Sequence, residues 1–182
     1  EEPEAMEGVL IKKADNMSCE EAAAVPIGGL EALHFLRKAN IQSGQKVLIF
    51  GAGGSIGTFA VQLAKSFGAE VTGVDSTGKL DTLRSIGADH VIDYTQEDFT
   101  KSAETYDVIL DVMGKSSFSG IVRSLKQNGR YLLGNAGLTQ MVRGRWTSMR
   151  SSKRPGVTRL LRWRVARRGN RPLQHLAVGD GQ

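Results

Sequence analysis

The stretch Lys46-Val47-Leu48-Ile49-Phe50-Gly51-Ala52-Gly53-Gly54-Ser55-Ile56-Gly57 decides the fold that we expect for this chain of 182 residues. It opens with a continuous apolar run, which is typical of a strand buried on both faces of a sheet. A glycine-rich turn follows directly, and the residues from Thr58 to Phe67 then repeat apolar side chains at helical spacing, until Gly68 ends the pattern. A buried strand, a glycine turn and a helix in this order predict the first unit of a dinucleotide-binding Rossmann domain.

The glycines of this turn have separate physical roles. Gly51 permits the tight turn, Gly53 or Gly54 lets the backbone approach a pyrophosphate, and Gly57 lets the helix pack closely on the sheet. The spacing is not a strict G-x-G-x-x-G, because position 56 is Ile. Free N–H groups and the positive dipole end at the helix start favour a bound phosphate. We therefore expect the cofactor to be bound by Gly51, Gly53, Gly54, Ser55, Ile56 and Gly57.

Strands and helices alternate along the rest of the chain. Further strands are expected at 71–75, 91–92, 107–112 and 130–133, with helices at 80–86 and 117–125 between them. Before the turn, Ser18 and Glu21 form a capping box for a helix that Pro26 interrupts, and a second helical stretch covers 30–39. This alternation predicts an α/β fold with a doubly wound parallel sheet of strand order 3-2-1-4-5.

Conflicting residues stand at the end of the second strand. Asp75 follows Gly51 by 24 residues, and an acid there accepts hydrogen bonds from the adenosine ribose, which favours NAD and repels a 2′-phosphate. Ser76, Thr77 and Lys79 come next and are suited to holding that phosphate instead. The alternative for Lys79 is an ordinary solvated surface residue.

Charge is distributed unevenly between the two parts of the chain. Residues 1–111 carry 18 acids and 9 bases, whereas residues 112–182 carry 15 bases and one acid, Asp180. The single cysteine, Cys19, excludes an internal disulfide, and no apolar run has membrane-spanning length, so we expect a cytoplasmic protein that does not bind membranes. Cys19, His34, His90 and His175 never cluster at ligand spacing, so we expect no metal.

Several segments together resemble the medium-chain dehydrogenase/reductase superfamily. They are 22–26, 44–49, 51–57, 87–94 and 129–131. The most similar branch is that of the zinc-free quinone oxidoreductases (zeta-crystallin-like) and related NAD(P)-dependent alcohol dehydrogenases. The resemblance covers about residues 8–153. It implies a remnant at 1–17 that links to a GroES-like catalytic domain absent from this chain, and an NAD(P)-binding Rossmann domain at 18–153.

The resemblance also implies a reaction and further site residues. Members transfer hydride from a reduced nicotinamide to a quinone, an enone or another carbonyl substrate, and the catalytic residues of this chain stay unknown. Lys79 and Tyr94 match positions that contact the 2′-phosphate in NADPH-using relatives, which gives a slight preference for NADP over NAD. Val112, Gly114 and Asn135 match strand ends beside the nicotinamide and its ribose. A homodimer is also expected from the family.

The last residues, 154–182, depart from the family in composition. Relatives continue into a sixth strand, so we expect that strand to be lost here and the edge of the fifth strand to be exposed, which predicts marginal stability and aggregation. The Arg-rich tail has three interpretations: translation out of frame, a disordered basic arm for nucleic acid, or a short basic helix on an anionic membrane. Binding of nucleic acid is the distant alternative. A dinucleotide-binding module without turnover is the nearer one.

Overall fold

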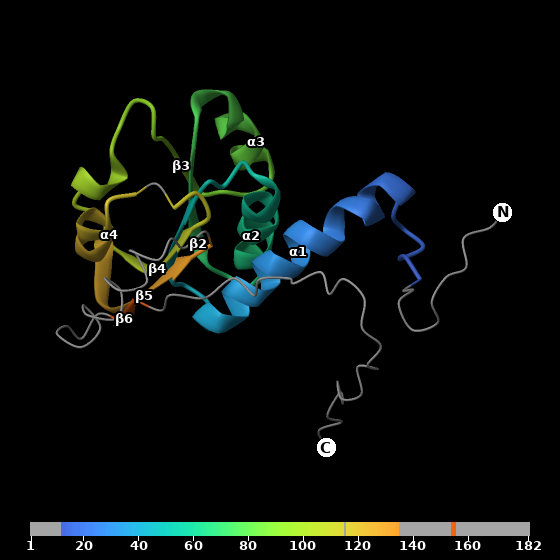
Figure 1. The fold of residues 1–182 in the computed structure, drawn as a ribbon, viewed down its shortest axis with the longest axis horizontal. Coiled ribbons are helices and arrows are strands. Elements are labelled where there is room, and N and C mark those ends of the chain that lie inside the picture. The colour runs from blue at the N-terminus through green and yellow to red at the C-terminus, as the bar shows by residue number, and fades with distance from the viewer. Residues whose placement is uncertain (1–11, 115, 135–153, 156–182) are drawn as a thin grey trace, which may run out of the picture.

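The computed structural model describes residues 12–114, 116–134 and 154–155 (Figure 1). Its centre is a parallel sheet in the order β3-β2-β1-β4-β5-β6, which confirms the expected 3-2-1-4-5 arrangement. The strands are β1 (Lys46–Phe50), β2 (Glu70–Asp75), β3 (His90–Asp93), β4 (Tyr106–Asp111), β5 (Leu125–Leu133) and β6 (Arg154–Pro155). β1 pairs with β2 from Lys46 opposite Glu70 and with β4 from Val47 opposite Val108. The most apolar strands, β1 and β4, are therefore the central pair.

Helices cover both faces of this sheet and make three layers (Figure 1). On one face α1 (Cys19–Ala39), α2 (Ser55–Ser66) and α3 (Leu80–Ser85) enclose a core with Val47, Ile49 and Val108. On the other face α4 (Phe118–Ser124) and the short 3-10 helix η2 (Phe99–Lys101) enclose a core with Leu48 and Ile109. Successive residues of a strand point to opposite faces, which is why β1 and β4 are apolar throughout.

Helix α1 differs from the expectation, because it is one helix from Cys19 to Ala39 that continues through Pro26. The expected capping box is present: Glu21 N donates to Ser18 Oγ, and Ser18 N donates to Glu21 Oε2. Pro26 is exposed, so it lies outside the buried inner face of the helix. Beyond it, the helix packs through Gly28, Ala32 and other buried residues of its inner face. Tertiary packing of this face outweighs the hydrogen bond that the proline removes.

The segment after β4 also differs from the expectation. α4 ends at Ser124, and β5 begins at Leu125, where the sequence predicted a helix through 125 and a strand only from 130. The β4–β5 register shifts between Tyr106 opposite Leu125 and Val108 opposite Arg130, and Asn128 adopts a positive φ of 66° within the irregularity. The turn residues Asn128 and Gly129 therefore form a bulge inside β5 instead of a loop that precedes it.

A sixth strand is present where the sequence predicted its loss. β6 is only two residues long, and its Arg154 and Pro155 lie opposite Arg130 and Tyr131 of β5 in a parallel pairing. Strand addition at an edge uses backbone groups, so it needs no family-like side chains. The expected exposed edge is thus covered over two residues of β5.

Candidate functional site

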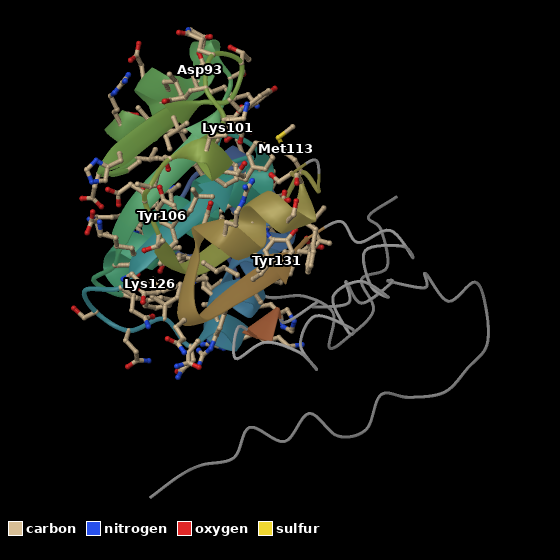
Figure 2. The ribbon with its side chains drawn as sticks, turned by 90° about the vertical axis from the view of Figure 1, so that its left-hand side faces the viewer. Asp93, Lys101, Tyr106, Met113, Lys126 and Tyr131 are labelled. Carbon is tan, nitrogen blue, oxygen red and sulfur yellow. The ribbon has the colours of Figure 1, made fainter. Side chains whose placement is uncertain are left out.

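The carboxyl ends of β1 and β4 meet at the point where the chain leaves the sheet in opposite directions. After β1 the chain passes into α2 on one face, and after β4 it leads to α4 on the other face. Val112 N donates to Phe50 O (2.9 Å), and Gly51 N donates to Val74 O (2.9 Å), so three strand ends are joined there. Open α/β sheets bind their ligands in the crevice outside such a switch point. This edge is the upper one in Figure 2, where Met113 is labelled toward it and Lys126 toward the opposite edge.

The glycine turn has the backbone geometry that its sequence predicts. Gly51 adopts a φ of 86°, which L side chains rarely adopt. A Cβ atom on Gly57 would overlap Gly51 O and lie 2.6 Å from the Cα and C atoms of Ala52. A Cβ on Gly54, in contrast, would meet only Gly51 O at 3.4 Å, an ordinary contact. Gly57 is therefore needed for the close packing of α2, whereas Gly54 leaves room above the backbone.

The start of α2 carries hydrogen-bond donors without a side-chain cap. Gly54 is the N-cap residue, and the helix ladder begins with Thr58 N donating to Gly54 O (2.9 Å). The N–H groups of Ser55, Ile56 and Gly57 precede that bond, and the first turn holds no acidic residue. Ser55 is exposed and Ile56 is half-buried. The helix end thus offers uncompensated donors and a positive dipole end, an arrangement that suits an anion.

Asp75 lies at the end of β2 and contacts the glycine turn directly. Its Oδ2 accepts a hydrogen bond from Gly53 N (2.7 Å), and its Oδ1 accepts from Ser76 N (2.8 Å) and from Ser76 Oγ (3.3 Å). Lys79 Nζ lies 3.6 Å from the same Oδ1, and the Lys79 stem lies over Gly53. Asp75 is only 4% exposed. The carboxylate predicted to bind ribose is therefore also a structural anchor of the turn, and Lys79 compensates its charge.

Tyr94 is positioned at the same side of the turn as Asp75. Its N–H donates to Asp75 O (3.2 Å), and its half-exposed ring packs edge-on against Phe50 with centroids 5.7 Å apart. Asp75 and Lys79 thus lie beside Gly53, and Ser76 and Tyr94 are hydrogen-bonded to Asp75. Their contact with the adenosine end of a cofactor stays a prediction. On the other side, Val112 and Gly114 follow β4, and Met113 covers Gly51, where a Cβ would lie 2.7 Å from Met113 Cγ. Asn135 lies outside the described residues.

The strand ends hold two further aspartates whose local roles the sequence reasoning missed. Asp93 accepts from Thr77 Oγ1, from Thr95 N (2.9 Å) and from Gln96 Nε2 (3.0 Å), and these bonds, Thr77 first, hold the pKa of its carboxyl below the ordinary value. Asp111 is fully buried and accepts from Gly114 N (2.7 Å) and Tyr131 Oη (3.3 Å). Burial raises the pKa of Asp111 despite these bonds. The sequence signal that could have identified Asp93 and Asp111 is an acidic residue at the end of an apolar strand.

In the described part of the chain, no three His, Cys, Asp or Glu side chains are gathered so as to hold a metal ion. His175 lies outside this part. Among the helices of residues 12–134 that the structure describes, none is long and apolar enough to span a membrane.

Comparison with known proteins places the chain in a family. A family model described as zinc-binding dehydrogenase matches residues 55–145. The 2-methylene-furan-3-one reductase of Solanum lycopersicum is 40% identical over 125 residues, which cover 68% of this chain and 32% of that protein. The chloroplastic NADPH-dependent alkenal/one oxidoreductase of Arabidopsis thaliana is 33% identical over 126 residues, with coverages of 68% and 32%. The chain thus spans about a third of the length of these curated relatives.

A solved structure gives the same relationship. The quinone oxidoreductase of Coxiella burnetii superposes with a TM-score of 0.70 at 29% sequence identity, over 80% of this chain and 45% of that one. Sequence and fold therefore agree on the resemblance that the glycine turn and its neighbouring motifs indicated. This chain belongs to the zinc-binding dehydrogenase family within the medium-chain dehydrogenase/reductase superfamily, and it carries the cofactor domain of that family.

Proposed function

We propose that this chain binds a nicotinamide dinucleotide in an oxidoreductase that transfers hydride, without zinc, to a quinone, an enone or another activated carbonyl compound. The observation that carries the proposal is the glycine turn followed by the uncapped start of α2. Gly54 has space above its backbone, and the N–H groups of Ser55, Ile56 and Gly57 begin the helix without a side-chain cap. A pyrophosphate needs both features: close backbone approach and donors that no other group uses.

The described residues fit the cofactor at both ends of the turn. On the side of β2, Asp75, Ser76, Lys79 and Tyr94 would hold the adenosine ribose and its substituent. On the side of β4, Val112 and Gly114 would border the nicotinamide end. When bound, the nicotinamide would supply the hydride. The role of the protein is to bind and orient the nicotinamide and to exclude water around it. The names of the relatives, a furanone reductase and an alkenal/one oxidoreductase, support an activated C=C or C=O bond as the acceptor.

We extend the proposal to a slight preference for NADPH. The Lys79 ammonium lies 3.6 Å from Asp75 Oδ1, so the charge of Asp75 that would repel a 2′-phosphate is partly compensated. Tyr94 lies on the same side, and one relative is named as NADPH-dependent. NADH stays the alternative, because Oδ2 of Asp75 has a second lone pair for a ribose hydroxyl beside its bond from Gly53 N. A cytoplasmic location and a homodimer stay predictions from the sequence.

Gly54→Ala tests the binding proposal with little disturbance of the fold. The added methyl group meets only Gly51 O at 3.4 Å, so we expect a stability loss of about 1 kcal/mol, the difference between Gly and Ala at an N-cap. It would project into the space of the pyrophosphate, and we expect NADPH affinity to fall at least about tenfold. Titration of NADPH fluorescence with the full chain measures this. Absence of saturable binding by the parent chain would refute the proposal, as would equal affinity in the variant.

Lys79→Ala tests the cofactor preference. Removal of this cation should weaken NADPH binding about tenfold or more while NADH binding changes little, because only NADPH carries the 2′-phosphate. Lys65→Ala is the matched control: it removes the same charge at the other end of α2, where Lys65 pairs with Asp89 at 2.7 Å. Equal losses for NADPH and NADH in Lys79→Ala would show that Lys79 has no part in the preference.

A second candidate function is a dinucleotide-binding module without turnover. The described site supports it, because the features identified there, the glycine turn and the uncapped start of α2, concern the binding of a dinucleotide. Consumption of NADPH with a test quinone separates the two candidates, because the module binds NADPH and oxidises none.

A further inference from the structure

Asp111 lies at the carboxyl end of the central strand β4 and is fully buried. Its Oδ1 accepts from Gly114 N at 2.7 Å, and its Oδ2 accepts from Tyr131 Oη at 3.3 Å. The backbone N–H groups of Met113 and Ser116 also interact with this carboxylate. In addition, Asp111 O accepts from Gly134 N at 2.8 Å. One residue thereby holds the segment that follows β4 and the end of β5.

The segment that Asp111 holds, Val112–Gly114, packs against the glycine turn at the switch point of the sheet. Gly114 adopts a φ of 68°, so the chain turns sharply there. The turn brings Met113 against Gly51: a Cβ on Gly51 would lie 2.7 Å from Met113 Cγ and 3.5 Å from Val112 Cβ. A Cβ on Gly134 would in turn lie 3.2 Å from Val112 Cα. The position of Val112 and Met113 relative to the glycine turn therefore depends on the hydrogen bonds that Asp111 makes with the segment Val112–Gly114.

Within the described residues, the Asp111 carboxylate is held by hydrogen bonds and forms no ion pair. β1 ends beside Asp111 with Phe50, and β5 brings Tyr131, the one titratable group in hydrogen-bond contact with the carboxylate in this part of the chain. Burial raises the pKa of Asp111, and it also raises the pKa of Tyr131. A buried carboxyl group without a cation needs its donors, since an unsatisfied acceptor there is costly. The donors from Gly114 and Tyr131 are therefore needed to keep the buried carboxyl group of Asp111 in place.

We propose that Asp111 is a positioning residue of the cofactor site, whose carboxylate holds the Val112–Gly114 turn against Gly51 with the Tyr131 hydroxyl as its second anchor. This inference rests on the proposed function, which assigns the segment Val112–Gly114 to the nicotinamide end of the cofactor. The side chains nearest to a Cβ on Gly51 are those of Met113 and Val112, so Asp111 acts on the turn through these two residues.

Four variants of the full chain test this role: Asp111→Ala, Asp111→Asn, Tyr131→Phe and, as a matched control, Asp98→Ala. Asp98 also accepts a backbone bond, from Thr100 N at 3.0 Å, but it caps η2 between β3 and β4. Asn keeps an oxygen that accepts from Gly114 N, and Phe keeps the shape of Tyr131. If Asp111→Ala does not fold, Asp111→Asn and Tyr131→Phe still test the role of the two hydrogen bonds.

Two readouts are needed. Amide hydrogen exchange at Gly114, followed by NMR without cofactor, reports whether the turn is held, and NADPH titration reports its effect on binding. Each lost hydrogen bond changes an equilibrium about two- to tenfold, so we expect faster exchange of that size in Tyr131→Phe and a larger increase in Asp111→Ala. NADPH affinity should fall in the same order, Asp111→Asn should recover most of both, and Asp98→Ala should change neither.

The outcomes separate this inference from the proposed function. Unchanged exchange at Gly114 in the Asp111 and Tyr131 variants would overturn the anchoring. Faster exchange with unchanged NADPH affinity would overturn the cofactor role and leave Asp111 a purely structural residue. No NADPH binding by the parent chain would refute the proposed function itself, and the exchange data alone would then report on the anchor.

Discussion

The close contact between Gly57 and the glycine turn predicts the effect of a single methyl group. In Gly57→Ala the new Cβ would overlap Gly51 O and lie 2.6 Å from the Cα and C atoms of Ala52. All of these are backbone atoms of the turn, so no side chain can rotate away to make room. To restore ordinary contact, the start of α2 must withdraw from the turn by about 1 Å, and the interior is too densely packed to absorb this freely.

The size of the effect follows from two opposing terms. Overpacking by one methyl group costs about 1–3 kcal/mol, and backbone neighbours place this case near 3 kcal/mol. Alanine inside a helix recovers about 1 kcal/mol relative to glycine. We therefore expect a net loss of about 2 kcal/mol in the free energy of unfolding. In a domain of this size the loss corresponds to a fall of about 4–8 °C in Tm.

Urea and thermal unfolding, followed by far-UV circular dichroism, measure this loss. Gly78→Ala is the matched control, because a Cβ there meets no atom within 4 Å and the glycine has no positive φ. We expect the control to stay within about 0.5 kcal/mol of the parent chain. If Gly57→Ala is as stable as Gly78→Ala, the reasoning from backbone contact is refuted.

Two further predictions concern the packing of α1 against α2 and the dependence of stability on acidic pH. Gly28→Ala should lower the free energy of unfolding by about 1–3 kcal/mol, because its Cβ would lie 2.6 Å from Ser55 Oγ and 2.7 Å from Ser55 O. The control Gly29→Ala, whose Cβ has its nearest contact at 3.3 Å, should lower it less. Equal midpoints of urea unfolding for the two variants would contradict this. The lowered pKa of Asp93 means that its ionised form stabilises the fold above the unfolded pKa of about 3.9, and this stabilisation is lost as pH falls through the lower folded value. The difference in urea unfolding between Asp93→Asn and the parent chain should therefore be largest at pH 7 and should shrink as the pH falls below about 3.9. A difference that does not change with pH would argue against a role for the carboxylate.

Local patterns were sufficient to predict much of the architecture. The apolar run of β1, the glycine turn and the helical spacing of α2 are contiguous, and their backbone preferences arise from nearest neighbours. The strand order followed from chain alternation and the handedness of crossovers. Pro26 misled the prediction for the same reason: its local effect is real, but burial of the inner face of α1 is not local.

The sequence by itself therefore determined the Rossmann domain, the glycine turn and its family. Only the tertiary structure showed what the aspartates at the strand ends contact. Asp75 meets Gly53 across 22 residues, and Asp111 meets Tyr131 across 20. Such pairs are brought together by parallel strand register, which places residues far apart in the chain at one edge of the sheet. Periodicity reports which face a side chain takes, whereas the partner of a carboxylate at a strand end depends on which strand lies beside it.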